Sequence, residues 1–174
     1  METRTLNPLK EMRLHSKMTQ KFLADITNMT PHAILRYEQG LYEDLSPKLS
    51  LFLSEQLDVL PSEIEKQYHD FQRERRQASA QYLSPFPALV MNAHEHPFIY
   101  FRNVVTMRAV GKKTRVGFCI LLAMNPAVVI QYENGTKLNL TSVMRDALKD
   151  AGVSFQHLED LDSYGEIWME RYGC

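Results

Sequence analysis

The feature that most constrains the fold is residues 18–40, MTQKFLADITNMTPHAILRYEQG. This stretch predicts two short helices joined by a tight turn. Thr19 is a good N-cap for the first helix, and Thr30, which a proline follows, is a good N-cap for the second. Gly40 then ends the second helix, because glycine adopts at little cost the left-handed conformation that commonly follows a helix. The sequence therefore predicts a capped helical pair.

Both helices carry apolar residues at helical spacing. The residues concerned are Phe22, Leu23 and Ile26 in the first helix, and Ala33, Ile34 and Tyr37 in the second. Helices this short cannot bury such faces alone, so further helices have to pack against them. A common arrangement of this kind is the helix-turn-helix, whose second helix enters the major groove of DNA. The alternative is an ordinary helical hairpin inside a larger bundle.

This helical pair resembles the Cro/C1-type helix-turn-helix family of phage repressors and related bacterial regulators. The likeness rests on Thr-Gln at the start of the first helix, Leu-Ala inside it and Tyr-Glu-x-Gly at the end of the second, and it covers roughly residues 6–60. It implies an all-α, lambda-repressor-like domain that binds double-stranded DNA. It also implies that Arg13 pairs with Glu38; the alternative is that both charges are solvated.

The charge composition bears on how such a domain could bind DNA. The chain has 174 residues, 20 Lys/Arg and 21 Asp/Glu, which give a formal net charge of −1. An isolated DNA-binding domain is usually basic overall, so any basic surface here has to be a local stripe. No apolar run is long enough to span a membrane, and the first residues lack the apolar core of a signal peptide. We therefore expect a cytoplasmic protein with no membrane partner, and the resemblance implies that the cytoplasm is bacterial.

Three further helices complete the first predicted domain, residues 1–80. They are expected over about residues 6–16, 46–57 and 62–80. The residues expected to face the core from them are Leu6, Leu9, Met12, Leu49, Phe52, Leu53 and Leu57.

The last of these predicted helices ends in a polar run, and a stretch with several prolines follows it. The run QRERRQASAQ predicts a solvated connector, and the alternative is a basic DNA-binding arm built from Arg73, Arg75 and Arg76. Residues 81–96 are predicted to be a linker, because prolines argue against a regular element. His94 and His96 lack a nearby third ligand and make a weak metal site.

The sequence also repeats itself at an interval of 95 residues. Residues 113–135, KTRVGFCILLAMNPAVVIQYENG, align with residues 18–40 without a gap. The identical residues in this copy, at cap, turn and stop positions, are Thr114, Met124, Pro126, Tyr132, Glu133 and Gly135. The repeat predicts a second, divergent helix-turn-helix domain over residues 97–174, in which Arg108 and Glu133 repeat the ion pair. Its helices are expected over residues 98–110, 114–124, 126–134 and 141–151.

The resemblance places the base-reading residues on the exposed face of the second helix of the motif, near its N-terminus. In the first domain the expected DNA contacts are Thr19, Gln20, Thr30, Pro31, His32, Leu35 and Arg36. Arg36 can donate two hydrogen bonds to a guanine edge, whereas Thr19 and Gln20 can bind phosphate at a helix N-terminus. The acidic loop over residues 42–44 argues against a phosphate contact there.

The second domain is expected to read bases less well. Its expected DNA contacts are Lys112, Lys113, Thr114, Arg115, Asn125, Ala127, Ile130, Gln131 and Lys137. Only Gln131 carries a group on the reading face that can bind adenine through two hydrogen bonds. The alternative is that the aliphatic run over residues 127–130 is buried against a protein partner.

No catalytic constellation occurs in the sequence, so we expect no enzymatic activity, cofactor or metal. Cys119 and Cys174 lack metal-ligand or redox spacing and are expected to be free thiols.

The acidic, aromatic residues 155–174 are expected to pack back on the second domain or to mediate a homodimer. Together, the resemblance and the repeat predict two tandem domains that act as a phage- or prophage-type repressor by occupying an operator. The alternative is an antitoxin-like regulator whose second domain mediates dimerisation or binds a protein partner.

Overall fold

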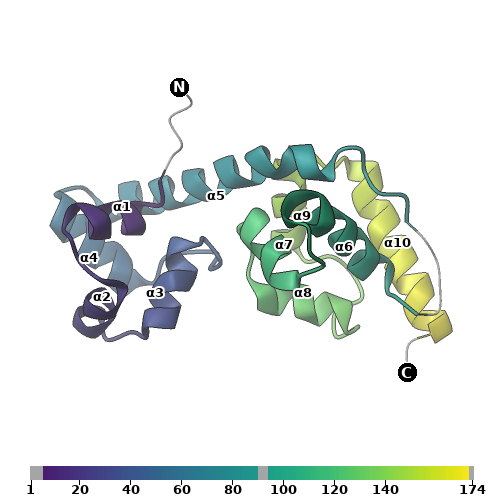
Figure 1. Ribbon diagram of the computed structural model, residues 1–174, viewed down its shortest axis with the longest axis horizontal. Helices are drawn as coiled ribbons and strands as arrows, with labels where there is room; N and C mark the ends of the chain where they lie inside the picture. The colour runs from purple at the N-terminus through teal and green to yellow at the C-terminus, as the bar shows by residue number, and fades with distance from the viewer. Residues whose placement is uncertain (1–5, 90–93, 173–174) are drawn as a thin grey trace. The chain divides into compact units, whose positions relative to one another are not determined.

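The computed structural model describes residues 6–89 and 94–172 of the chain. Within those residues the regular elements are ten α-helices, α1 to α10, and no strand (Figure 1). The all-α class predicted from the sequence is confirmed. The chain divides into two compact units, Met1–Glu74 and Arg75–Cys174, which we call the first and second units. None of the described helices has the length and apolarity needed to cross a membrane.

The first unit is built from five helices, the last of which runs on past residue 74. They are α1 Pro8–His15, α2 Gln20–Thr27, α3 Pro31–Glu38, α4 Pro47–Leu57 and α5 Pro61–Leu83. In each of the first four, a side chain accepts a hydrogen bond from a backbone N–H of the first turn; these caps are Asn7, Thr19, Thr30 and Ser46. Replacing such a cap by alanine costs about 1 kcal/mol. Short polar residues thus fix where each of these four helices starts.

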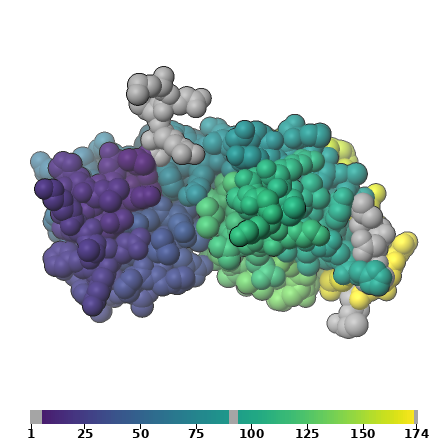
Figure 2. All heavy atoms as spheres, in the orientation of Figure 1, coloured from purple at the N-terminus to yellow at the C-terminus, as the bar shows by residue number. Residues whose placement is uncertain are grey.

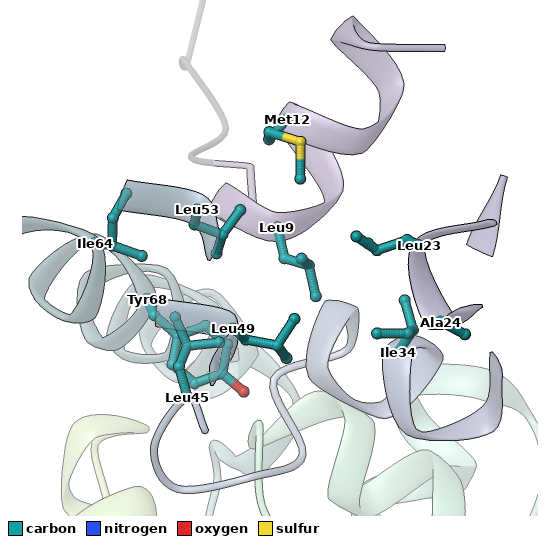
Figure 3. Close-up of a cluster of buried hydrophobic side chains, with 10 residues drawn as sticks. All are labelled: Leu9, Met12, Leu23, Ala24, Ile34, Leu45, Leu49, Leu53, Ile64 and Tyr68. Carbon is teal, nitrogen blue, oxygen red and sulfur yellow. The ribbon is translucent and has the colours of Figure 1, made fainter. Parts of the chain in front are cut away.

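The core of the first unit collects the inward-facing side of each helix (Figure 3). The buried side chains in it are Leu9, Met12, Leu23, Ala24, Ile34, Leu45, Leu49, Leu53, Ile64 and Tyr68. Burying one large aliphatic side chain of this kind is worth about 1.5 to 3 kcal/mol. The space-filling view shows that side chains close the spaces between the ribbons within each unit (Figure 2).

Four apolar residues that the spacing assigned to this core are instead exposed. Their exposed fractions are 47% for Leu6, 52% for Phe22, 44% for Ile26 and 41% for Leu57. Helix α2 turns Leu23, Ala24 and Thr27 inward, which leaves Phe22 and Ile26 on its solvent side. The Thr27 hydroxyl donates to the Leu23 carbonyl oxygen at 2.7 Å, so this polar side chain can occupy a buried position. The core assignment of these four residues is therefore wrong.

The second unit contains the end of α5 and five further helices. These are α6 Pro97–Val110, α7 Arg115–Leu121, α8 Pro126–Glu133, α9 Ser142–Asp150 and α10 Phe155–Tyr172. Aromatic rings fill much of its core: the Phe98 ring centroid lies 5.7 Å from that of Phe118 and 5.0 Å from that of Tyr132, both edge-on. Helix α10 packs on α6 and α9, so the C-terminal segment packs back on its own unit. Cys119 is a buried free thiol, and Cys174 lies outside the described residues.

Several boundaries in the second unit recur at the sequence interval of 95 residues. Helices α2 and α7 begin 95 residues apart, and α3 and α8 both begin and end 95 residues apart. Gly40 and Gly135 follow those two helices with φ of 72° and 74°. Asn28 and Ala123, at matching positions between the helices, are also left-handed, with φ of 53° and 45°. Helix α6 differs, because it begins at Pro97 and not at residue 103 as the interval would give.

The last turns of α5 cap the end of α7. The Ser79 hydroxyl donates to the Leu121 carbonyl oxygen at 2.7 Å. Arg76 donates through Nε and Nη2 to the carbonyl oxygens of Leu122 and Ala123, at 2.9 and 3.2 Å. Carbonyls at the end of a helix lack partners within it, so these bonds satisfy groups that would otherwise need water. Arg76 is thus part of neither a solvated connector nor a DNA-binding arm, and both expectations are wrong for this residue.

Candidate nucleic-acid interface

Helix α3 divides its residues between core and solvent. Ile34 is fully buried and Glu38 is 6% exposed. The residues on the opposite side, Pro31, His32 and Leu35, are exposed, and Arg36 is partly exposed. The residues expected to read bases therefore lie on the accessible side of a helix whose other side is held in the core.

An ionic network around Glu38 fixes the end of α3. Arg13, on α1, donates through Nε and Nη2 to the two carboxylate oxygens at 2.5 and 3.2 Å. Gln20, at the start of α2, donates through Nε2 to the same carboxylate at 2.7 Å. Arg13 also donates from Nη1 to the Met18 carbonyl oxygen at 3.0 Å. One buried carboxylate therefore ties three helices together, and the pair that the resemblance implied between Arg13 and Glu38 is present.

The side chains of Thr19 and Gln20, two residues expected to bind phosphate, make hydrogen bonds within the protein. Thr19 Oγ1 accepts a hydrogen bond from the Phe22 N–H at 3.0 Å, and the Gln20 amide is bound to Glu38. The sequence did not reveal the second of these bonds, because eighteen residues separate its partners. What this helix start offers to phosphate is its backbone N–H groups, which an α-helix leaves without partners of its own.

Arg36 lies beside the loop that follows α3. Its guanidinium carbon is 4.9 Å from the ring centroid of Tyr42, a distance typical of a cation–π contact. The Tyr42 ring lies in turn against Tyr37, with centroids 4.3 Å apart. The sequence placed Tyr42 only in an acidic loop, because no helical or strand spacing relates it to Arg36. The structure adds this ring to the candidate interface.

Two side chains of α5 hold this loop. Gln72, 3% exposed, donates through Nε2 to the carbonyl oxygens of Gly40 and Tyr42 at 2.9 and 2.6 Å. The Tyr68 hydroxyl donates to the same Tyr42 oxygen at 3.1 Å. Burial raises the pKa of Tyr68, so its hydroxyl stays a protonated donor at neutral pH. The position of Tyr42 is therefore set by residues that belong to the core.

Helix α8 of the second unit shows a similar division with fewer polar groups. Its buried residues are Val129, Tyr132 and Glu133, and its exposed residues include Ala127, Ile130 and Gln131. Asn125 Oδ1 caps the helix by accepting from the Ala127 N–H at 3.0 Å. Gln131 is the one exposed side chain among these three with hydrogen-bonding groups.

The ion pair expected between Arg108 and Glu133 does not form. Glu133 accepts hydrogen bonds from Arg102 and Arg115, each at 2.6 Å. Arg108 instead donates to two carbonyl oxygens at the end of α5 and just after it, at 3.3 and 2.7 Å. Residues six apart on a helix point about 120° away from each other. Because α6 begins early, Arg102 lies on this helix and pairs with the buried Glu133, as Arg13 pairs with Glu38 in the first unit.

Basic residues gather around the start of α7 and after α8. Lys112, Lys113 and Lys137 are exposed. Thr114 Oγ1 caps α7 by accepting from the Gly117 N–H at 3.4 Å. The Arg115 side chain keeps 41% of its surface exposed while it pairs with Glu133. These side chains offer positive charge at the positions where phosphate contacts were expected.

Charge is distributed unevenly along the second unit. Residues 97–140 contain six Lys/Arg and one Asp/Glu, whereas residues 141–174 contain three Lys/Arg and seven Asp/Glu. The net charge of the chain therefore conceals a basic segment that precedes an acidic one. Of the six basic residues, Lys112, Lys113 and Lys137 are exposed lysines, and only charge that faces DNA would release counterions.

His96 has a structural role. Its Nδ1 accepts a hydrogen bond from the Phe98 N–H at 3.2 Å at the start of α6. Its ring contacts those of Tyr132 and Trp168, with centroids 5.3 and 5.2 Å away. Burial lowers the pKa of His96 to about 4, so the ring is neutral at pH 7. Across residues 6–89 and 94–172, no group of three or more His, Cys, Asp or Glu side chains is arranged to hold a metal ion.

Comparison with known protein families identifies the first unit. Residues 9–64, about a third of the chain, match the family described as Helix-turn-helix. They form one helix-turn-helix domain of the Cro/C1 type, and a domain of this type implies DNA binding. The matched residues run from α1 to the start of α5, and the match does not extend to the second unit. None of the curated proteins and none of the solved structures compared with the chain matches it.

Proposed function

We propose that the chain is a sequence-specific regulator of transcription, of the phage- or prophage-repressor type, which acts by occupying a double-stranded operator. The observation that carries this proposal is a solvent-accessible row on α3, within the matched helix-turn-helix domain: His32 and Leu35 are exposed and Arg36 is partly exposed. The Glu38 network supports it, because a reading helix must hold its residues in fixed positions to discriminate between bases.

Each residue of this row suits a particular base edge. Arg36 donates two hydrogen bonds to a guanine edge, and Leu35 contacts a thymine methyl group. His32 donates or accepts one hydrogen bond. The backbone N–H groups at the start of α2, next to Thr19, bind phosphate and set the register of the domain on DNA.

We further propose that the second unit is a second helix-turn-helix domain. The recurrence of helix boundaries at 95 residues and the basic residues around α7 support this proposal. Gln131 would read adenine, and Lys112, Lys113, Arg115 and Lys137 would bind phosphate. The reading faces of the two units differ in sequence. A single chain should therefore recognise an asymmetric site with two unlike halves.

A second candidate role for this unit is protein binding, either in a homodimer or with a partner as in antitoxin-like regulators. Exposed aliphatic side chains favour it: Val116 is 56% exposed, Val110 is 50% exposed and Ile130 is 39% exposed. Large apolar side chains that are exposed in the free protein suit a contact with another protein. In this case only the first unit would bind DNA.

Selection of bound duplexes from a random pool of double-stranded DNA, with the full chain, tests the proposal. A regulator of this kind should enrich one sequence, and competition with random DNA should not remove the bound protein. If the second unit binds protein, Gln131→Ala should leave the enriched sequence unchanged. If the second unit reads bases, Gln131→Ala should relax the base preference in one half of the site. Recovery of unselected sequences would contradict the assignment as a sequence-specific regulator.

A further inference from the structure

We propose that Tyr42 positions the guanidinium group of Arg36 and is thereby a specificity-determining residue of the first unit. The inference rests on the proposed function, because it assumes that Arg36 reads a base. It assigns a role to a loop residue that lies outside the two helices of the motif. The tyrosine would act through Arg36 and would not itself touch a base.

The contact between the two residues carries the proposal. Arg36 and Tyr42 are both partly exposed, and the guanidinium carbon lies 4.9 Å from the ring centroid. An arginine side chain has many rotamers, and fixing it on binding DNA costs conformational entropy. A side chain already held against a ring has fewer rotamers to lose. The planar guanidinium stacks well on an aromatic face and keeps its N–H groups at the edge for hydrogen bonds.

The ring can hold Arg36 only if it is itself held. On one side it lies against Tyr37, which belongs to α3. Its backbone carbonyl accepts hydrogen bonds from Gln72 and from the fully buried Tyr68. These bonds anchor the loop to α5 within the first unit. The ring therefore has a defined position relative to α3 before any DNA is bound.

A double-mutant cycle on the full chain tests this role. Binding of Tyr42→Leu, Arg36→Ala and the double variant is measured on a duplex that the unaltered chain selects from a random pool, and on random duplex DNA. An exposed cation–π contact is worth about 0.5 to 1 kcal/mol and more when desolvated. Tyr42→Leu should therefore weaken binding to the selected duplex about two- to fivefold and leave binding to random duplex nearly unchanged. In the Arg36→Ala background the same change should have less than a twofold effect.

The control is Tyr42→Phe, which keeps the ring and should keep the binding of the unaltered chain. An equal loss from Tyr42→Leu with and without Arg36 would overturn the inference, because the tyrosine would then act independently of the arginine. No loss at all from Tyr42→Leu would also overturn it. If the unaltered chain selects no sequence, the proposed function itself fails. If selection depends on Arg36 but not on Tyr42, only this inference fails.

A measurement without DNA covers the case in which Tyr42→Leu does not fold. In the NMR spectrum of the free full chain, the ring current of Tyr42 should shift the Arg36 Hδ resonances upfield. Tyr42→Phe should preserve that shift. Random-coil Hδ shifts for Arg36 in the unaltered chain would overturn the inference without any variant.

Discussion

Arg76 Nε, near the end of α5, lies 2.9 Å from the carbonyl oxygen of Leu122, just past the end of α7. The same guanidinium also binds the Ala123 carbonyl and the Asp150 carboxylate, at 3.2 and 3.0 Å. Residues 75–83 are therefore part of the packing of the second unit. A fragment that began at residue 97 would lose them.

Replacing Arg76 by methionine should destabilise the second unit by about 2 to 3 kcal/mol, because it leaves two carbonyl oxygens and a carboxylate without their donor. The chain has a single tryptophan, Trp168, which lies in this unit, so its fluorescence reports urea unfolding of the unit. The control is Lys149→Met, in the same unit. Lys149 pairs with Asp146 at the surface and should contribute less than about 1 kcal/mol. Equal unfolding midpoints for both variants would contradict the capping role of Arg76.

The network around Glu38 predicts that Arg13→Met and Glu38→Gln each destabilise the first unit by about 2 to 4 kcal/mol. Either change leaves a charge unpaired in a site where the two side chains are 12% and 4% exposed. Amide hydrogen exchange of residues in α1 to α3 would measure the loss. As a control, Lys66→Met breaks a surface pair and should change protection by less than about 1 kcal/mol. Exchange rates that match the unaltered chain in both network variants would contradict the structural role.

Arg36→Ala should weaken binding to the selected duplex by about 1 to 3 kcal/mol and scarcely change binding to random DNA, as expected for a base contact. Equilibrium titrations at one fixed salt concentration measure both. Lys48→Ala, an exposed residue of α4 outside the proposed interface, should leave both affinities unchanged. An equal loss on the two DNAs would show that Arg36 binds phosphate and not a base.

The burial of His96 predicts a pH dependence for the second unit. Its pKa is lowered to about 4 when folded, so the unfolded chain binds a proton between about pH 6.5 and pH 4 while the folded unit does not. Stability from this group is complete above pH 6.5 and falls as the pH drops toward 4, by at most about 3 kcal/mol. Urea unfolding followed by Trp168 fluorescence at several pH values measures it.

His96→Asn serves as the comparison, because asparagine can still cap α6 but does not titrate. Comparing the two chains at each pH cancels the contribution of other groups. The difference in unfolding free energy between them should change between pH 7 and pH 4. A difference that stays constant over this range would refute the assignment of the pH dependence to His96.

The sequence located the helices more reliably than it located their contacts. N-cap side chains such as those of Thr19, Thr30 and Asn125 accept a hydrogen bond from a backbone N–H two or three residues further along the chain. A local sequence pattern is therefore enough to predict them. The same holds for Gly40, whose positive φ is a local requirement. To predict which side chains are buried, one must also know which side of a helix its neighbours cover. The helical period of a short helix does not give this, and the core assignment of Phe22 and Ile26 was therefore wrong.

The contacts that could not be predicted join residues far apart in the chain. The repeat assigned Arg108 to Glu133, but the longer α6 places Arg102 there instead. Gln72 and Tyr42 meet across thirty residues of chain with no sequence pattern to relate them. Likewise, the polar run that contains Arg76 gives no sign that this residue binds backbone carbonyls near the end of α7. In each case the tertiary arrangement of helices decides the partner, and a spacing rule cannot.

Footprinting of the full chain on its selected duplex tests the central claim most directly. If both units read DNA, one chain should protect about two turns, roughly 20 base pairs, of an asymmetric site, since half-sites lie about one turn apart. Gln131→Ala should then relax base preference in one half only, and Arg36→Ala in the other. Protection of a palindrome by two chains, each covering about one turn, with no effect of Gln131→Ala, would contradict base reading by the second unit and leave it a dimerisation or partner-binding module.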